Sequence, residues 1–174
     1  MPGSSRANET RKGAAVQAKA TTAQTAALEK QNADLRSAEA RRLAREALIA
    51  ARMLDASLEV LTTDIQTARA RFGGARDGPV PLPTAHDFRH IIGKPGFTYL
   101  WDKVGVLDRE IAVRFLALEA AIDRLRAEEG ATHVGGLTDR LDQISLLVER
   151  LRELAGGEIQ KTTAILSPGF AAAA

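Results

Sequence analysis

One uninterrupted stretch constrains this chain more than any other: residues 26–72 contain neither glycine nor proline. The stretch lacks both helix breakers and is rich in alanine, leucine, arginine and glutamate, so it favours a single long helix. We predict that this helix covers residues 23–72. A helix of this length indicates an all-α fold, because a helix gains most of its stability by packing an apolar face against other helices.

Apolar residues recur along the second half of this helix at alternating intervals of four and three. That spacing is the seam of a heptad repeat. Extended backwards, the same register falls mainly on alanine, so we expect the distance to a neighbouring helix to grow along the chain. The predicted helix-packing positions are Leu54, Leu58, Leu61, Ile65 and Phe72.

A second set of apolar residues lies off this seam, mostly on the opposite face: Leu28, Leu35, Ile49, Met53 and Val60. A helix that is apolar on two sides is usually sandwiched between neighbours. The alternative is that helices further along the same chain cover the apolar stripe, because the spacing of apolar residues does not indicate whether the covering helix belongs to the same chain or to another.

Glycine and proline divide the rest of the chain. Two glycines follow the long helix, and three alternating prolines then predict a semi-rigid connector over residues 73–83. Residues 84–155 read as a helical region. It contains a short helix after Thr84, a second helix from Phe97 to about Glu129, and a third that ends before Gly156 and Gly157.

The third predicted helix has a regular seam at Leu137, Leu141, Ile144, Val148 and Leu151. With fewer than three heptads it is too short to be stable alone. We expect it to fold back on the second helix as a hairpin, to associate with copies of itself, or both. Its mixed seam residues favour more than two helices in the assembly and leave their number open.

Four of the seven aromatic residues fall close together, at Phe88, Phe97, Tyr99 and Trp101. We interpret them as a compact aromatic knot that fixes the turn into the second helix. The competing interpretation is an exposed docking patch for another protein.

Both ends read as extended polar arms. Residues 1–22 are polar and basic, with Val16 as the single large apolar residue after Met1. Residues 156–174 form a tail with a β-like stretch at 162–166, which could pair with a neighbouring sheet edge. The fold class is therefore all-α, with a long N-terminal coiled-coil-like helix, a connector, a short helix, a two-helix hairpin and two arms.

Composition excludes several functions. Cysteine is absent, so the chain has no disulfide, thiol nucleophile or cysteine-based zinc site. The net charge of +2 argues against a dedicated nucleic-acid binder. No apolar run is long enough to cross a bilayer, and the N-terminus lacks the apolar core of a signal peptide. We expect a cytoplasmic or virion protein without a membrane partner.

The most tempting chemical motif is His86-Asp87-Phe88-Arg89-His90, whose two histidines at i and i+4 are similar to the zincin pattern. The general-base position holds the shorter Asp87, the helix is short, and the remaining histidine, His133, lies in a glycine-rich loop. We therefore predict no metal, no cofactor, no catalytic residue and no enzymatic activity.

These features favour a non-enzymatic structural subunit that oligomerises through coiled-coil packing. In architecture the chain resembles small helical components of bacteriophage particles, such as fibres, collars and head-to-tail parts. That resemblance implies a virion component whose partners are copies of itself, three or more, and other proteins of the assembly. The alternative is a helical accessory protein that binds nucleic acid through its basic N-terminal region and a face formed by Arg36, Arg41, Arg42 and Arg45.

Overall fold

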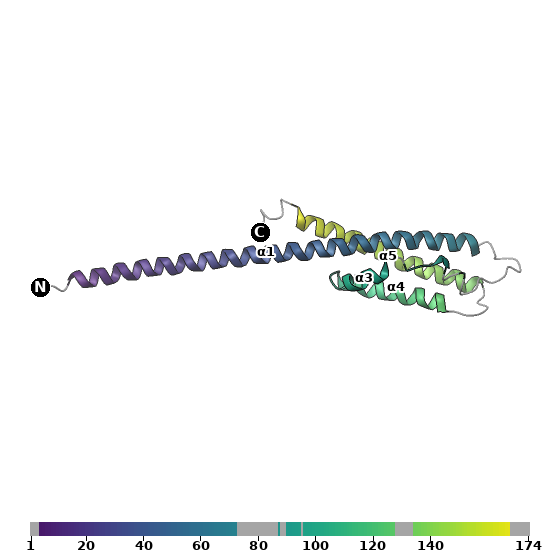
Figure 1. The fold of residues 1–174 in the computed structure, drawn as a ribbon, viewed down its shortest axis with the longest axis horizontal. Helices are drawn as coiled ribbons and strands as arrows, with labels where there is room; N and C mark the ends of the chain where they lie inside the picture. Colours follow the sequence, from purple (N-terminus) through teal and green to yellow (C-terminus); the bar gives the residue numbers. More distant parts are fainter. Residues whose placement is uncertain (1–3, 73–86, 88–89, 95, 128–133, 168–174) are drawn as a thin grey trace. The chain divides into compact units, whose positions relative to one another are not determined.

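The computed structural model describes residues 4–72, 87, 90–94, 96–127 and 134–167. These residues form helices and no strand, which confirms the predicted all-α fold. The helices are α1 (Ser4–Phe72), α3 (Phe97–Val104), α4 (Arg109–Ala127) and α5 (Val134–Leu166) (Figure 1). The chain divides into two units, Met1–Arg42 and Leu43–Ala174, and each is described by itself. The predicted connector over residues 73–83 lies outside the described residues.

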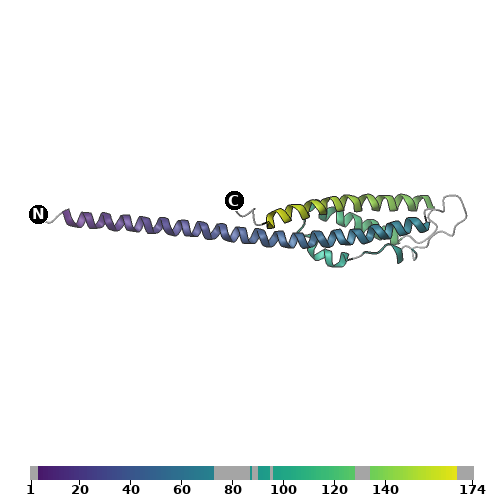
Figure 2. The same ribbon diagram turned by 90° about the horizontal axis from the view of Figure 1, so that it is seen from above.

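In the described part of the second unit, α1, α4 and α5 form a bundle with the short α3 beside it (Figures 1 and 2). Ion pairs show that α5 is antiparallel to α1, because Arg69 pairs with Asp142 and Asp55 pairs with Arg152. An ion pair of 3.8 Å between Glu110 and Arg150 lies between α4 and α5.

The core of this bundle is one continuous cluster of buried apolar side chains. Helix α1 contributes alanine side chains from residues 47–51 and larger apolar side chains from residues 54–65 to this core. These residues lie on the heptad seam or next to it. From α4 it takes Ile111, Phe115, Leu118, Ile122 and Leu125, which recur at intervals of three and four on one face. The interior therefore follows the helical period of the sequence closely.

A predicted continuous helix from Phe97 to Glu129 is wrong, because the chain turns between α3 and α4. Helix α3 ends at Val104 with Gly105 as its C-cap, and Leu107 is buried in the turn. Helix α4 then starts anew: the backbone N–H of Glu110 donates to the Asp108 side chain at 2.9 Å. Asp108 is thus the N-cap that begins α4.

Gly96 lets the chain enter α3 at close range to α1. It has a left-handed backbone with φ of 69°, a conformation that glycine adopts without steric penalty. A Cβ atom added here would lie 2.8 Å from the Oγ atom of buried Ser57 on α1. Nearby, the backbone N–H of Gly93 donates to the Asp64 side chain at 3.2 Å. These two contacts fix the segment that precedes α3 against α1.

Two predicted arms are helical over most of their described lengths, so those predictions are wrong. Helix α1 begins at Ser4, and α5 runs on to Leu166. The expected end of α5 at Gly156 and Gly157 fails because the seam continues past them, with Glu158 and Thr162 buried. The expected β-like stretch at 162–166 is therefore helical, and Thr162 donates its hydroxyl to the Glu158 carbonyl at 2.7 Å.

Candidate interaction surfaces

The predicted packing positions on α1 are buried within a single chain. Leu54, Leu58, Leu61 and Ile65 contribute to the core of the second unit and are at most 3% exposed. The side chain of Phe72 lies outside the described residues. Helices of the same chain therefore cover this stripe, which is the alternative that the sequence left open.

The seam of α5 is covered in the same way. Leu141, Ile144, Val148 and Leu151 are buried in the same cluster, whereas the side chain of Leu137 is not described. The two seams that suggested further chains are thus satisfied inside one bundle. Any surface for another molecule must consist of other residues.

The aromatic residues do not form one knot. Phe97 is buried and packs against Phe115 with ring centroids 4.9 Å apart. Trp101 meets Phe115 edge-on at 6.1 Å and is about half exposed. Tyr99 is 74% exposed, and Phe88 lies outside the described residues. The structure therefore divides the group into a core residue, a residue at the core's edge and a surface residue.

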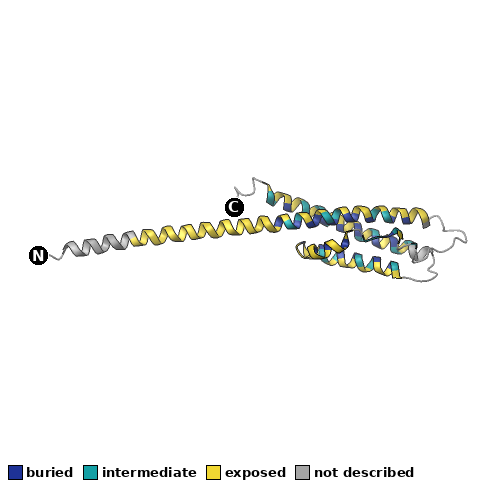
Figure 3. Cartoon of the chain, viewed as in Figure 1, coloured by how far each residue is buried: buried dark blue, intermediate teal, exposed yellow. Residues whose placement is uncertain are grey.

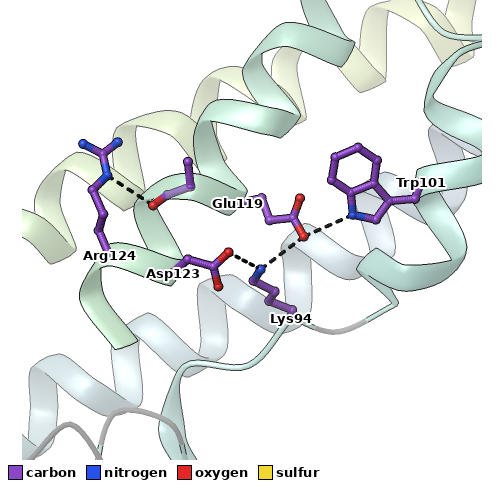
Figure 4. Close-up of polar contacts among 6 residues, drawn as sticks. Lys94, Trp101, Glu119, Asp123 and Arg124 are labelled. Atoms are coloured by element: carbon purple, nitrogen blue, oxygen red, sulfur yellow. Dashed lines mark hydrogen bonds and ion pairs between the residues drawn. The ribbon is translucent and has the colours of Figure 1, made fainter. Parts of the chain in front are cut away.

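Trp101 belongs to a polar network that joins three segments of the second unit (Figure 4). Its indole N–H donates to an Oε atom of Glu119 at 3.1 Å, and Lys94 Nζ donates to the same oxygen at 3.1 Å. Lys94 also donates to Asp123 at 2.7 Å. The Lys94 and Glu119 side chains are only 22% and 15% exposed, so this pair is better shielded from water than most surface ion pairs. The network anchors α3 and the chain before it to α4.

The described side chains of the first unit, residues 17–42, are all exposed (Figure 3). Two of them are large apolar residues, Leu28 at 59% and Leu35 at 60% exposure. They lie seven residues apart, about two turns, and so occupy the same side of the helix. This unit is the longest run of described chain without a buried residue.

A shorter apolar surface lies on the outer face of α4. Val113, Leu116, Ala117 and Ala120 are exposed and recur at helical spacing opposite the buried face. They span about two turns, far less than the exposed helix of the first unit.

The basic residues of α1 do not form the single face predicted for nucleic-acid binding. Arg36 and Arg45 are nine residues apart, which is two and a half turns, so they lie on opposite sides of the helix. Arg41 and Arg42 are exposed like the other two.

On α5, the hydrogen bond from Arg150 to Glu153, at 2.7 Å, raises the pKa of the Arg150 guanidinium, which leaves it charged at any ordinary pH.

Of the zincin-like motif, the structure describes Asp87 and His90 alone, and His90 is exposed. Within the described ranges, no three histidine, cysteine or carboxylate side chains gather as metal ligands. A search of the same residues finds no helix both long enough and apolar enough to traverse a bilayer.

Comparison with known proteins gives no match: no protein-family model, curated protein or solved structure is similar to this chain.

Proposed function

We propose that this protein is a non-enzymatic assembly subunit in which a folded helical bundle carries a helix that packs with helices of other chains. The packing element is the exposed segment of the first unit, residues 17–42. The bundle supplies the folded body, since its own seams are covered by its own helices.

The observation that supports the proposal is the exposure of this whole segment in helical conformation. Helices in proteins gain most of their stability from packing an apolar face, and residues 17–42 have no such packing within their own chain. Leu28 and Leu35 each leave more than half of their surface in water on the same side of the helix. Burying one leucine side chain contributes about 1.5–3 kcal/mol, so a partner helix would stabilise the segment.

The experiment replaces both leucines by aspartate in the full chain. We expect the wild-type protein to exceed the 18.6 kDa of one chain in light scattering. The Leu28→Asp/Leu35→Asp variant should fall to that mass and lose helical circular dichroism from the first unit. The melting of the bundle should be unchanged, because neither residue contributes to its core.

A matched control carries Lys30→Asp and Ser37→Asp, which have the same seven-residue separation on another side of the helix. This control should keep the wild-type mass. A wild-type protein at the mass of one chain, with the leucine variant equally helical, would contradict the proposal.

Assembly within a bacteriophage particle is a narrower form of this proposal, and its support is the helical architecture alone.

A further inference from the structure

We infer that the partner of the exposed segment is the same segment of a second copy, parallel and in register, with Asn32 facing Asn32. This inference rests on the proposed function and names the partner, the number of chains and their direction.

The first step is the register of the exposed segment. Six positions follow each other at alternating intervals of three and four, the spacing of a two-stranded coiled-coil seam. They are Ala18, Thr21, Thr25, Leu28, Asn32 and Leu35, and all six are exposed within their own chain.

The two threonines in this seam are less polar than their type suggests. Thr21 donates its hydroxyl to the Gln17 carbonyl at 2.9 Å, and Thr25 donates to the Thr21 carbonyl at 3.0 Å. A hydroxyl that is already bonded to its own helix needs no further partner, so its burial carries little desolvation penalty. Both threonines can therefore be covered by a second helix.

The second step is the direction of the partner. In the heptad, Leu28 and Leu35 share one seam position, and Thr25 and Asn32 share the other. Antiparallel helices place one kind of position opposite the other, so a leucine would never face a leucine. A parallel pair in register places leucine against leucine at both layers. A parallel pair shifted by one heptad would keep only one of these layers.

The third step is Asn32. Its carboxamide both donates and accepts hydrogen bonds, so it can pair with an identical group across a two-fold axis. A single asparagine at this type of seam position specifies register and number of strands at some loss of stability. Glu39 and Arg42 occupy the next two seam positions, where like charges from two parallel chains would meet. The pairing therefore ends near Leu35.

Cysteine crosslinking tests the direction and the register, because the native chain contains no cysteine. Ala18→Cys, at one end of the seam, should form a disulfide-linked pair in a glutathione redox buffer, because an antiparallel pair would place the two cysteines about 25 Å apart along the axis. Lys30→Cys, on the outer side of the helix, should stay mostly reduced. Light scattering of the wild-type full chain should give twice the 18.6 kDa of one chain at high concentration.

Asn32→Leu tests the role of the asparagine. We expect this variant to assemble at lower concentration but to lose its single mass, with larger assemblies beside the two-chain form. A wild-type mass of three or more chains, or equal crosslinking at residues 18 and 30, would overturn the inference. If the leucine-to-aspartate variant still abolished that assembly, the proposed function would stand. A wild-type protein that stayed at one chain, with no response to that variant, would remove both.

Discussion

Replacing Gly156 and Gly157 by alanine is expected to stabilise the protein, although glycine pairs usually mark the end of a helix. Both lie inside the 33 residues of α5, well before its last residue, Leu166. A Cβ atom added at either position meets nothing within 4 Å apart from the adjoining backbone of its own helix. The substitution therefore adds helix propensity without steric conflict.

The size of the effect follows from that geometry. Alanine is favoured over glycine in a helix interior by about 0.8–1.0 kcal/mol, so the pair should contribute about 1.6–2.0 kcal/mol. The gain reaches the whole bundle because Glu158 and Thr162, beyond the glycines, are buried against it. For a chain of this size, about 2–4 °C per kcal/mol gives a rise in Tm of roughly 3–8 °C.

Urea unfolding of the full chain, followed by circular dichroism, would measure the gain. The midpoint should rise for each single variant and further for the double variant, with an unchanged slope. A lower midpoint would mean that the chain leaves the helix at the glycines, where alanine would be strained. An unchanged midpoint would mean that residues 158–166 do not unfold together with the bundle.

Three further substitutions test other contacts of the bundle by the same unfolding assay. Gly96→Ala should lower the free energy of unfolding by at least about 1–2 kcal/mol, because it combines a left-handed backbone with a clash at Ser57. Adding Ser57→Ala should recover only the part of this loss that comes from the clash, and full recovery would exclude the backbone penalty. Phe115→Ala should remove about 3–5 kcal/mol, whereas the exposed neighbour Leu116→Ala should change little; similar losses at both would contradict the assigned core face. Lys94→Met should remove about 1–3 kcal/mol, because it takes a donor from two carboxylates; an unchanged midpoint would show that the network carries no stability.

The heptad spacing made the interior of α1 predictable within the bundle. Each large seam residue that was predicted and whose side chain is described is buried, and so are Ala44, Ala47 and Ala51 from the narrow part of the same register. The earlier positions of that register, Ala33, Ser37 and Ala40, are exposed. The spacing predicts burial because residues three and four apart lie on the same face of a helix, whatever packs against that face. For the same reason, the spacing did not reveal that the covering helices belong to the same chain.

The ends of helices were less predictable because they depend on single residues. Gly105 and the capping Asp108 divide α3 from α4, yet the apolar positions recur in register on both sides of that turn. The preference of aspartate for the N-cap position was the signal in the sequence that could have indicated a new helix after Asp108. At Gly156 the opposite error arose, since continued burial at Glu158 and Thr162 outweighs the low propensity of glycine.

The N-terminal segment was misread because it lacks large apolar residues. Its alanine, glutamine and lysine residues favour a helix by propensity alone, and the structure has a helix from Ser4 onward. Leu28 and Leu35 were recognised as lying off the main seam. Their exposure could not be derived from the sequence, because it depends on how much of each side chain the rest of the chain leaves uncovered.

The buried side chains of α1 change in size along the bundle, with alanine at residues 44, 47, 50 and 51 and leucine or isoleucine from Leu54 to Ile65. Alanine burial removes much less apolar surface from water than leucine burial does. Since α5 is antiparallel to α1, the alanine end faces the last turns of α5, where Thr162 replaces an apolar seam residue. Local opening of the native bundle should therefore start at this end, and amide protons near residues 44–51 should exchange with deuterium sooner than those near residues 58–65.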